Sequence, residues 1–353
     1  MKKNRVLVAM SGGVDSSVAA YLLKKQGFDV IGVTMHLWAE ADSDSACCSL
    51  SSVEDARKVA SKIGFPHYTL NMKKVFEKKV VSNFIEEYKR GRTPNPCVRC
   101  NQYIKFDALL KKAEELGAEY ISTGHYARIE KKRGRYFLRK GKDQSKDQSY
   151  FLYCMSQKAL SMTLFPMGDI KKTKTRMIAK KLGLPVADKK ESQEICFVPD
   201  DNYGKFLQDH FKENIDPGPI IDKKGNVVGE HNGIIFYTVG QRKGLGIGGS
   251  GPYYVISIDK KKNAVIVGGK NDVFREELLA EGINTISFAM PSEPIEVKAR
   301  IRYNAREEKA TLEAFGKGLV KVKFNKPVRA VTPGQSVVFY DGDIVVGGGI
   351  IKE

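Results

Sequence analysis

Hydrophobic and polar positions along the first two hundred residues follow two alternating patterns. Continuous apolar runs, typical of strands buried on both faces, occupy residues 5–10, 29–35, 67–70 and 120–123. Between them, apolar side chains recur at helical spacing over 16–26, 51–64, 75–88 and 106–116. Strands that alternate with helices predict an α/β domain with a doubly wound parallel sheet and helices on both of its faces.

After about residue 205 the pattern changes to short β-rich runs separated by Gly, Pro, Asn and Asp. These runs lie at 253–258, 264–267, 297–302, 319–324, 336–340 and 344–351. Such spacing predicts small β-domains with a β-barrel at the C-terminus. A chain of 353 residues is too long for one ordinary core. We therefore expect a catalytic domain over 1–205, a central β-rich domain over 206–275 and a C-terminal β-barrel over 276–353.

The charge of the chain is strongly positive, with 59 Lys and Arg against 41 Asp and Glu and a formal net charge of +18. Between Arg128 and Lys146 nine residues are basic and two are acidic, and a second cluster follows at 171–176. Clustered cations bind a phosphate backbone by releasing its counterions. This clustering favours a polyanionic partner over a merely solvated surface, although charge alone does not separate RNA from DNA or from membrane headgroups.

The sequence shows no sign of membrane insertion or secretion. No apolar run approaches the roughly 20 residues that cross a bilayer. Residues 1–5 lead into a short apolar stretch that a glycine loop ends, unlike a signal peptide. We expect a cytoplasmic protein with no membrane partner, in which six cysteines do not build a disulfide framework. Metal binding, redox chemistry or nucleophilic catalysis are the roles to weigh for cysteines that belong to a motif.

A glycine-rich loop separates the first predicted strand from the first predicted helix. It reads Ser-Gly-Gly-Val-Asp-Ser-Ser at 11–17. Glycines let the backbone approach a phosphate closely, and hydroxyls and helix-start amides donate to its oxygens. The loop is neither a Walker sequence nor a dinucleotide fingerprint. It resembles the PP-loop of the ATP pyrophosphatases, which cleave ATP between its α and β phosphates and adenylate an acceptor.

That resemblance implies an adenine-nucleotide α-hydrolase fold, ATP as cosubstrate and Mg²⁺ on the pyrophosphate. Asp15 would help to hold Mg²⁺, unless it only caps its helix. The implied ATP-binding residues are Ala9, Met10, Ser11, Gly12, Gly13, Val14, Asp15, Ser16, Met35 and Gly124.

Two cysteine-containing segments indicate which acceptor is adenylated. One reads Gly-Arg-Thr-Pro-Asn-Pro-Cys-Val-Arg-Cys-Asn at 91–101, and the other Glu-Ser-Gln-Glu-Ile-Cys-Phe-Val at 191–198. Both resemble the tRNA-specific 2-thiouridylases, which make 2-thiouridine at the anticodon wobble position. The resemblance extends over nearly the whole chain, through 122–127, 146–152, 240–245, 302–303 and 333–335.

The family chemistry implies a role for two cysteines. ATP adenylates the C2 oxygen of the uridine, Cys196 carries a persulfide that delivers sulfur to C2, and Cys100 is the partner nucleophile. Without the resemblance, Cys196 reads equally well as a buried cysteine in an Ile-Cys-Phe-Val strand. The remaining cysteines, Cys47, Cys48 and Cys154, match no motif.

Cys97 departs from the family pattern, because many members have Asp at this position. With Cys100 and Cys196 it makes three thiols, which resembles the tRNA thiolases that hold a [4Fe-4S] cluster. A cluster on Cys97, Cys100 and Cys196 is therefore the alternative to the persulfide route.

The resemblance further implies contacts to the target base and to the rest of the tRNA, together with an upstream sulfur donor such as a cysteine desulfurase or a relay protein. The implied contact residues are Asn95, Pro96, Cys97, His125, Lys146, Asp147, Gln148, Arg302, Tyr303 and Gln335. Two other functions stay open: an ATP pyrophosphatase that amidates or ligates another acceptor, and a non-catalytic tRNA-binding protein with a degenerate nucleotide site.

Overall fold

The computed structural model describes residues 4–38, 50–190, 195–211, 214–248, 252–287, 293–316 and 318–353. The chain forms two compact units, each made of segments that are distant in the sequence. Unit 1 comprises Met1–Val80, Cys97–Asp201 and Asp343–Val346, and unit 2 comprises Val81–Pro96, Asn202–Gly342 and Gly347–Glu353.

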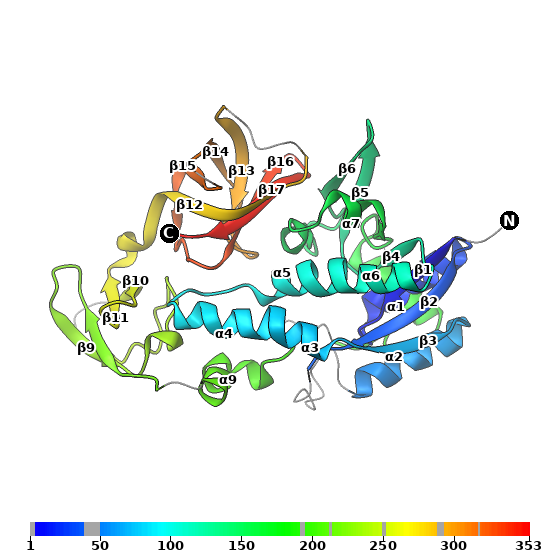
Figure 1. Cartoon of the computed structure of the whole chain (residues 1–353), viewed down its shortest axis with the longest axis horizontal. Coiled ribbons are helices and arrows are strands. Elements are labelled where there is room, and N and C mark those ends of the chain that lie inside the picture. Colours follow the sequence, from blue (N-terminus) through cyan, green and yellow to red (C-terminus); the bar gives the residue numbers. More distant parts are fainter. Residues whose placement is uncertain are drawn as a thin grey trace. The chain divides into compact units, whose positions relative to one another are not determined.

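Unit 1 is built on a parallel sheet with the strand order β3-β2-β1-β4-β7. All four neighbouring pairs in this order are parallel. The chain thus starts in the middle of the sheet and winds outward in both directions (Figure 1). The strands are β1 (Arg5–Ala9), β2 (Asp29–His36), β3 (His67–Asn71), β4 (Tyr120–Ser122) and β7 (Thr163–Leu164).

Helices cover this sheet because alternate strand residues are apolar on both faces. Val6 and Val8 join one core cluster with buried residues of α1, α2 and α8, whereas α6 packs against β4. The doubly wound sheet that the sequence predicts is therefore confirmed. The helices with their ends in unit 1 are α1 (Val14–Lys25), α2 (Leu50–Ile63), α3 (Lys73–Phe76), η2 (Asn101–Ala108), α6 (Leu109–Glu115), η3 (Ser149–Leu152), α7 (Gln157–Ser161), α8 (Lys172–Lys181) and η4 (Pro199–Asp201).

The predicted helix over 75–88 is observed as three helical segments, α3, η1 (Glu77–Val81) and α4 (Ser82–Lys89), and η1 is π-helical. Phe76, Val80, Phe84 and Tyr88 are all buried and lie four residues apart. A spacing of four exceeds the 3.6 residues of an α-helical turn. The wider turn of the π-helical segment keeps these side chains on one face.

An antiparallel hairpin of β5 (Ala127–Lys132) and β6 (Arg135–Lys140) follows the fourth parallel strand. This hairpin is not predicted from the sequence. Its strands carry mostly charged side chains and show no clear alternation of apolar residues. The first residues of β17 (Ile344–Ile351) pair with β6 and extend the hairpin.

The first part of unit 2 is a mixed sheet with the strand order β10-β11-β8-β9. Its apolar interior includes Ile220, Val255, Val265 and Val267, all fully buried. The elements of this part are α9 (Tyr203–His210), β8 (Gly218–Ile221), β9 (Val227–His231), η5 (Ile234–Phe236), β10 (Tyr254–Asp259), β11 (Ala264–Gly268) and η6 (Lys270–Val273).

The second part of unit 2 is a β-barrel. Within the described residues, strands in the order β12-β15-β14-β13-β16-β17 close on themselves through the pairing of β12 with β17. Buried residues alternate with more exposed ones along much of β14 and β15, and Ala310, Leu312 and Val322 are among the buried residues. The predicted C-terminal barrel is thus confirmed. Its remaining strands are β12 (Phe274–Thr285), β13 (Ile295–Arg300), β14 (Glu308–Ala314), β15 (Val320–Arg329) and β16 (Ser336–Asp341).

Among the described residues, no helix combines the length and the apolar composition that a membrane span requires.

Candidate functional site

The glycine-rich loop lies where the parallel sheet changes direction. It leaves β1 at Ala9 and enters α1 at Val14, and β1 has β2 on one side and β4 on the other. The connections after β1 and β4 diverge at this edge, which in open α/β sheets is where ligands bind. Gly13 precedes α1 and provides no side-chain cap, so the first amides of the helix are not capped by their own N-cap residue.

The conformation of the loop depends on the hydrogen bonds of its own hydroxyl groups and on the lack of a side chain at Gly12. Ser16 Oγ accepts a hydrogen bond from the Ser11 N–H at 3.2 Å, and it donates to the Gly13 carbonyl at 3.2 Å. Gly12 has φ +66°, and a Cβ at this position would lie 2.4 Å from the Ser52 carbonyl oxygen. Only glycine fits this turn, as expected for a loop that cradles a phosphate.

The loop after β4 contacts the start of α1. A Cβ on Gly124 would lie 2.7 Å from the Ser16 nitrogen and 2.9 Å from the Asp15 carbonyl carbon. Met10 donates its N–H to the carbonyl of Val33, two residues before Met35 on β2. The structure thus brings the predicted ATP-binding residues together at one edge of the sheet.

Asp15, in the first turn of α1, binds a lysine and a tyrosine from distant segments. Its two carboxylate oxygens accept hydrogen bonds from Lys172 Nζ at 2.8 and 2.7 Å, and the Tyr126 hydroxyl donates to Oδ1 at 2.8 Å. The side chain of Lys172 is 11% exposed. The Tyr126 oxygen also lies 2.8 Å from Thr175 Oγ1, one turn along α8 from Lys172. The sequence does not identify Lys172 or Tyr126 as neighbours of the phosphate loop.

Cys100 is buried at a junction between two kinds of helix. It ends α5 (Pro96–Cys100), and the π-helical segment η2 follows at once. The next residue, Asn101, is also buried and donates through Nδ2 to the Phe151 carbonyl at 3.1 Å. Cys97, one turn before Cys100, is exposed. The two cysteines of the Cys-x-x-Cys sequence therefore have different access to solvent.

Cys196 lies in a turn that the Val198 N–H closes by donating to the Ile195 carbonyl at 3.0 Å. It is partly exposed, and it is not part of a strand. Its neighbour Phe197 is buried edge-on against Phe76 of α3, with ring centroids 5.6 Å apart. Because α3 also packs against η2, the segments of both proposed sulfur-carrying cysteines attach to the same helix within unit 1.

The described residues give no support to an iron–sulfur cluster. A [4Fe-4S] cluster on three thiolates requires these side chains to converge on one position. Cys97, Cys100 and Cys196 all belong to the described part of the chain, in which no three His, Cys, Asp or Glu side chains form a group that could hold a metal. The geometry of unit 1 therefore gives the cluster alternative no support.

The Cys154 residue is partly exposed, but its thiol is buried and lies close enough to Cys100 to be affected by it. Its thiol donates to the carbonyls of Val98 and Phe151 at 3.7 and 3.8 Å. Burial raises the pKa of Cys154 to about 12, and Cys100 contributes to this rise. The Cys154 thiol therefore stays protonated at neutral pH. Cys47, Cys48 and residues 191–194 lie outside the described residues.

The predicted RNA contacts of unit 1 differ in accessibility. His125 is buried between Phe106 and Phe165, and its Nδ1 lies 2.7 Å from Thr123 Oγ1. Burial, reinforced by the charge of Lys105, lowers the pKa of His125 well below its ordinary value, so its ring is neutral.

Residues 146–148 lie in a loop, and none of the three is fully exposed. Asp147 is buried, and its Oδ1 accepts from the N–H groups of Gly141 and Ser149 at 3.0 and 3.2 Å. Gln148 Oε1 accepts from the Tyr126 N–H at 3.0 Å. Lys146 and Gln148 are partly exposed, whereas the Asp147 carboxylate faces its own loop.

Unit 2 carries the other predicted RNA contacts. Gln335 Nε2 donates to the carbonyls of Thr93 and Pro94 at 3.0 and 3.1 Å and so holds the segment that precedes Asn95 and Pro96. Arg302, elsewhere in the barrel, donates to the Arg329 carbonyl at 2.6 Å. Tyr303 stacks below Arg300, whose guanidinium lies 5.4 Å from its ring centroid.

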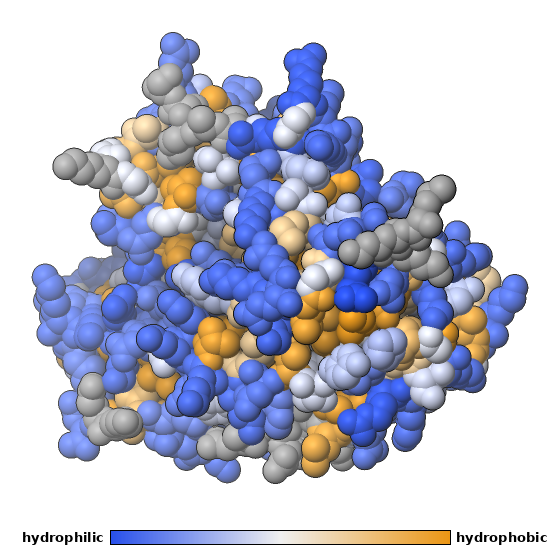
Figure 2. Space-filling model, turned by 45° about the vertical axis from the view of Figure 1, so that its right-hand side comes forward, coloured by the Kyte–Doolittle hydropathy of each residue, from blue (hydrophilic) through white to orange (hydrophobic). Residues whose placement is uncertain are grey.

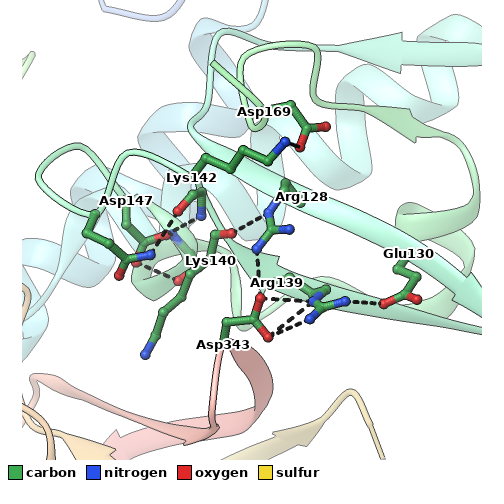
Figure 3. A network of polar contacts seen from close by, with 11 residues as sticks. Arg128, Glu130, Arg139, Lys140, Lys142, Asp147, Asp169 and Asp343 are labelled. Carbon is green, nitrogen blue, oxygen red and sulfur yellow. Dashed lines mark hydrogen bonds and ion pairs between the residues drawn. The ribbon is translucent and has the colours of Figure 1, made fainter. Parts of the chain in front are cut away.

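The basic cluster of the sequence maps largely onto the β5–β6 hairpin and the loop after it. Asp343 pairs with Arg128 at 2.7 Å and with Arg139 at 2.8 Å, and Arg139 also pairs with Glu130 at 2.6 Å (Figure 3). Figure 2 shows hydrophilic side chains over most of the face that it draws. Arg128 and Arg139 are thus compensated within the protein, and Lys142 of the same cluster pairs with Asp169 at 3.0 Å.

Three family models match successive segments of the chain. The tRNA methyl transferase HUP domain matches residues 4–200, the tRNA methyl transferase PRC-barrel domain matches 204–269, and the aminomethyltransferase β-barrel domain matches 275–351.

Curated relatives match the chain over nearly its full length. One tRNA-specific 2-thiouridylase MnmA 1, from Caldanaerobacter subterraneus subsp. tengcongensis, is 56% identical and covers 99% of this chain and 98% of its own. The tRNA-specific 2-thiouridylase MnmA of Clostridium acetobutylicum is 55% identical and covers 99% of both chains. That of Clostridioides difficile is 52% identical and covers 99% of this chain and 98% of its own.

Proposed function

This chain belongs to the family of tRNA-specific 2-thiouridylases, and on that premise we propose that it uses ATP to convert the wobble uridine of tRNA to 2-thiouridine. The observation that carries the proposal is the arrangement of unit 1. A phosphate-binding loop lies at the switch point of its sheet, and both cysteine segments attach to α3 in the same unit. The names of the first two family models mention methyl transfer. Two cysteines in the same unit as the phosphate loop suit sulfur transfer instead.

The first step that we propose is activation of the base. The C2 carbonyl of uridine is a weak electrophile, and transfer of AMP to its oxygen creates a leaving group. The glycines at 12 and 13, the Ser11 and Ser16 hydroxyls and the first amides of α1 would bind the phosphates. Met35 and Gly124 would line the adenosine side of the same edge, with Ala9, Met10 and Val14 shaping the loop.

The second step is sulfur transfer. The terminal sulfur of a Cys196 persulfide attacks C2 and AMP leaves, which joins the base to Cys196 through a disulfide-like bridge. The Cys100 thiolate then attacks the Cys196 sulfur. The bridge breaks with its electron pair on the departing sulfur, so 2-thiouridine is released and a Cys100–Cys196 disulfide remains. A thiol reductant must reduce this disulfide before the next cycle.

Mg²⁺ and the sulfur source complete the proposal. Mg²⁺ binds carboxylate and phosphate oxygens, and when bound it would neutralise the departing pyrophosphate. The Asp15 carboxylate lies at the phosphate loop and is 29% exposed, and it would hold Mg²⁺ by exchanging a contact with Lys172 for the ion. An upstream cysteine desulfurase or relay protein would load Cys196. We place the enzyme in the cytoplasm, where wobble-uridine tRNA and reducing thiols occur together.

We further propose a division of labour along the chain. Residues 1–205 would carry catalysis, 206–275 a connecting β-domain and 276–353 a tRNA-contacting barrel. Asn95, Pro96 and Cys97 would contact the target base, and Lys146, Gln148, Arg302, Tyr303 and Gln335 would contact the tRNA. Because His125 and Asp147 are buried, we assign them to supporting the contact surface rather than to meeting the RNA directly.

The test is reconstitution with purified enzyme, ATP, unmodified tRNA and a persulfide donor, read out as 2-thiouridine by nucleoside mass spectrometry. The wild-type enzyme should thiolate tRNA, and Cys100→Ser and Cys196→Ser should each abolish the product while ATP still binds. Cys154→Ser, whose thiol is enclosed, is the matched control and should keep the product. Absence of 2-thiouridine with active wild-type protein would refute the proposal.

The same assay separates the rival functions. ATP–pyrophosphate turnover that needs no tRNA and survives Cys196→Ala would indicate an amidating or ligating enzyme. Failure to bind ATP, with tRNA binding intact, would indicate a non-catalytic RNA-binding protein.

A further inference from the structure

Residues 142–149 repeat a four-residue sequence, Lys-Asp-Gln-Ser, twice in succession. The two copies also repeat a geometry. Asp143 Oδ1 accepts from the N–H and the hydroxyl of Ser145 at 3.1 and 2.6 Å. Asp147 accepts from the N–H and the hydroxyl of Ser149 at 3.2 and 2.8 Å. Each copy is therefore a rigid turn in which an aspartate binds the serine two residues later.

The first copy is fixed to the start of α8. Asp143 Oδ2 accepts from the backbone N–H of Lys172, the first residue of that helix, at 2.9 Å. Lys171, the N-cap residue of α8, provides no side-chain cap. Asp143 therefore caps the helix from a distant loop, and this contact is the largest cause of the lowered pKa of Asp143.

The second copy is fixed to Tyr126. Gln148 accepts from the Tyr126 N–H through Oε1 at 3.0 Å, and its own N–H donates to the Tyr126 carbonyl at 3.0 Å. Both backbone polar groups of Tyr126 are thereby held by one residue of the loop.

Lys172 and Tyr126, to which the two copies of the repeat are fixed, also bind Asp15. Lys172 Nζ contacts both Asp15 oxygens and the Tyr126 hydroxyl contacts one of them. Asp15 adjoins the phosphate-binding residues, so its charge and orientation affect any phosphate that binds there. A carboxylate without its lysine would repel a triphosphate.

We propose that the duplicated loop 142–149 is a positioning element of the ATP site, in which Asp143 acts through Lys172 and Gln148 acts through Tyr126 on the Asp15 carboxylate. This inference rests on the proposed use of ATP. Since Lys146 and Gln148 are also proposed RNA contacts, tRNA bound to the loop would change the affinity for ATP, and ATP would change the affinity for tRNA by the same factor.

The test measures ATP and adenosine affinities by titration calorimetry with Mg²⁺ and without tRNA. Asp143→Ala should weaken ATP binding about fivefold to tenfold and adenosine binding less than twofold, because only ATP places phosphates beside Asp15. The matched control is Asp169→Ala, which removes an exposed ion pair with Lys142 of the same loop. It should leave both affinities unchanged.

A double-mutant cycle tests the route of the effect. If Asp143 acts through Lys172, then Asp143→Ala should have little further effect in a Lys172→Met background. Tyr126→Phe, which keeps the buried ring and removes only the hydroxyl, should also weaken ATP binding more than adenosine binding, and it tests the second arm if Asp143→Ala unfolds.

Three results would overturn the inference: ATP affinity within twofold of wild type in Asp143→Ala and Tyr126→Phe, equal losses for ATP and adenosine, or additive effects of Asp143 and Lys172. Wild-type protein that binds ATP but makes no 2-thiouridine would instead refute the proposed function. The ATP and adenosine affinities of the variants would then still test whether the loop positions the ATP site. Wild-type protein that binds no ATP would overturn both.

Discussion

At the scale of single residues, three thiols of unit 1 differ in their surroundings. Cys196 is partly exposed in a turn, Cys100 is buried at a helix junction, and Cys154 donates to two backbone carbonyls. The thiolate is the reactive form of cysteine, so reactivity follows pKa and access. The raised pKa of Cys154 makes its thiol unsuited to sulfur transfer at neutral pH.

We predict that Cys154 resists alkylation in the folded protein. With a pKa of about 12, only roughly one thiol in ten thousand is ionised at pH 8. Brief treatment with iodoacetamide at this pH should modify the exposed Cys97 and leave Cys154 unmodified, as measured by peptide mass spectrometry. Denatured protein, in which all cysteines react, is the control. Rapid modification of Cys154 in native protein would contradict the prediction.

At the scale of elements, the phosphate loop and the β5–β6 hairpin depend on different forces. The loop depends on a backbone conformation and on close backbone approach at Gly12. The hairpin combines the pairing of its two strands with the ion pairs of Asp343 with Arg128 and Arg139. Each can be tested with a variant that removes one contribution and a control that retains it.

Gly12→Ala should destabilise the protein more than Gly117→Ala. Both glycines have φ near +65°, which costs an alanine about 1–2 kcal/mol. Nothing lies within 4 Å of a Cβ on Gly117, whereas a Cβ on Gly12 would meet the Ser52 backbone at 2.4 Å. We expect urea unfolding to show the larger loss for Gly12→Ala, and ATP binding to be lost in this variant alone. Equal losses of stability would show that the turn can relax.

Asp343→Asn should destabilise the protein at neutral pH, by about 1 kcal/mol because the ion pairs are partly exposed. The hydrogen bond from Arg139 is the largest cause of the lowered pKa of Asp343. A lowered folded-state pKa stabilises the fold above the unfolded-state value near 4, and this contribution is lost as the pH falls through the folded-state pKa. The difference between wild type and variant in urea unfolding should therefore shrink below pH 4. Asp169→Asn, which affects an ion pair more than half exposed, is the control and should change little.

At the scale of the whole molecule, the net charge of +18 dominates the encounter with RNA. Counterion release makes such binding steeply dependent on salt. We predict that tRNA affinity, measured by fluorescence anisotropy, falls on the order of tenfold or more between 50 and 200 mM KCl. Binding of adenosine, which carries no phosphate, should hardly change over the same range. A flat salt response for tRNA would mean that the basic clusters do not contact the backbone.

The sequence by itself determined the features that depend on neighbouring residues. Gly27, the first residue after the helical pattern at 16–26, has φ +92° and donates its N–H to the Lys24 carbonyl, as is typical of a glycine that follows a helix. Strand β17 covers the predicted 344–351 because its apolar run has turn residues before it. The doubly wound sheet, the barrel and the phosphate loop follow from periodicities and glycines of this local kind.

Only the tertiary structure decided which distant residues meet. Lys172 and Tyr126 lie 157 and 111 positions from Asp15 in the chain, and neither carries a local pattern that points to the phosphate loop. Asp147 has a sequence typical of a surface loop, yet its carboxylate binds two backbone amides within a turn. The π-helical segment η1 interrupts a stretch that the sequence predicts as one helix over 75–88. These contacts depend on the order of the strands and on hydrogen bonds between residues that are far apart in the chain. No local sequence pattern reveals either.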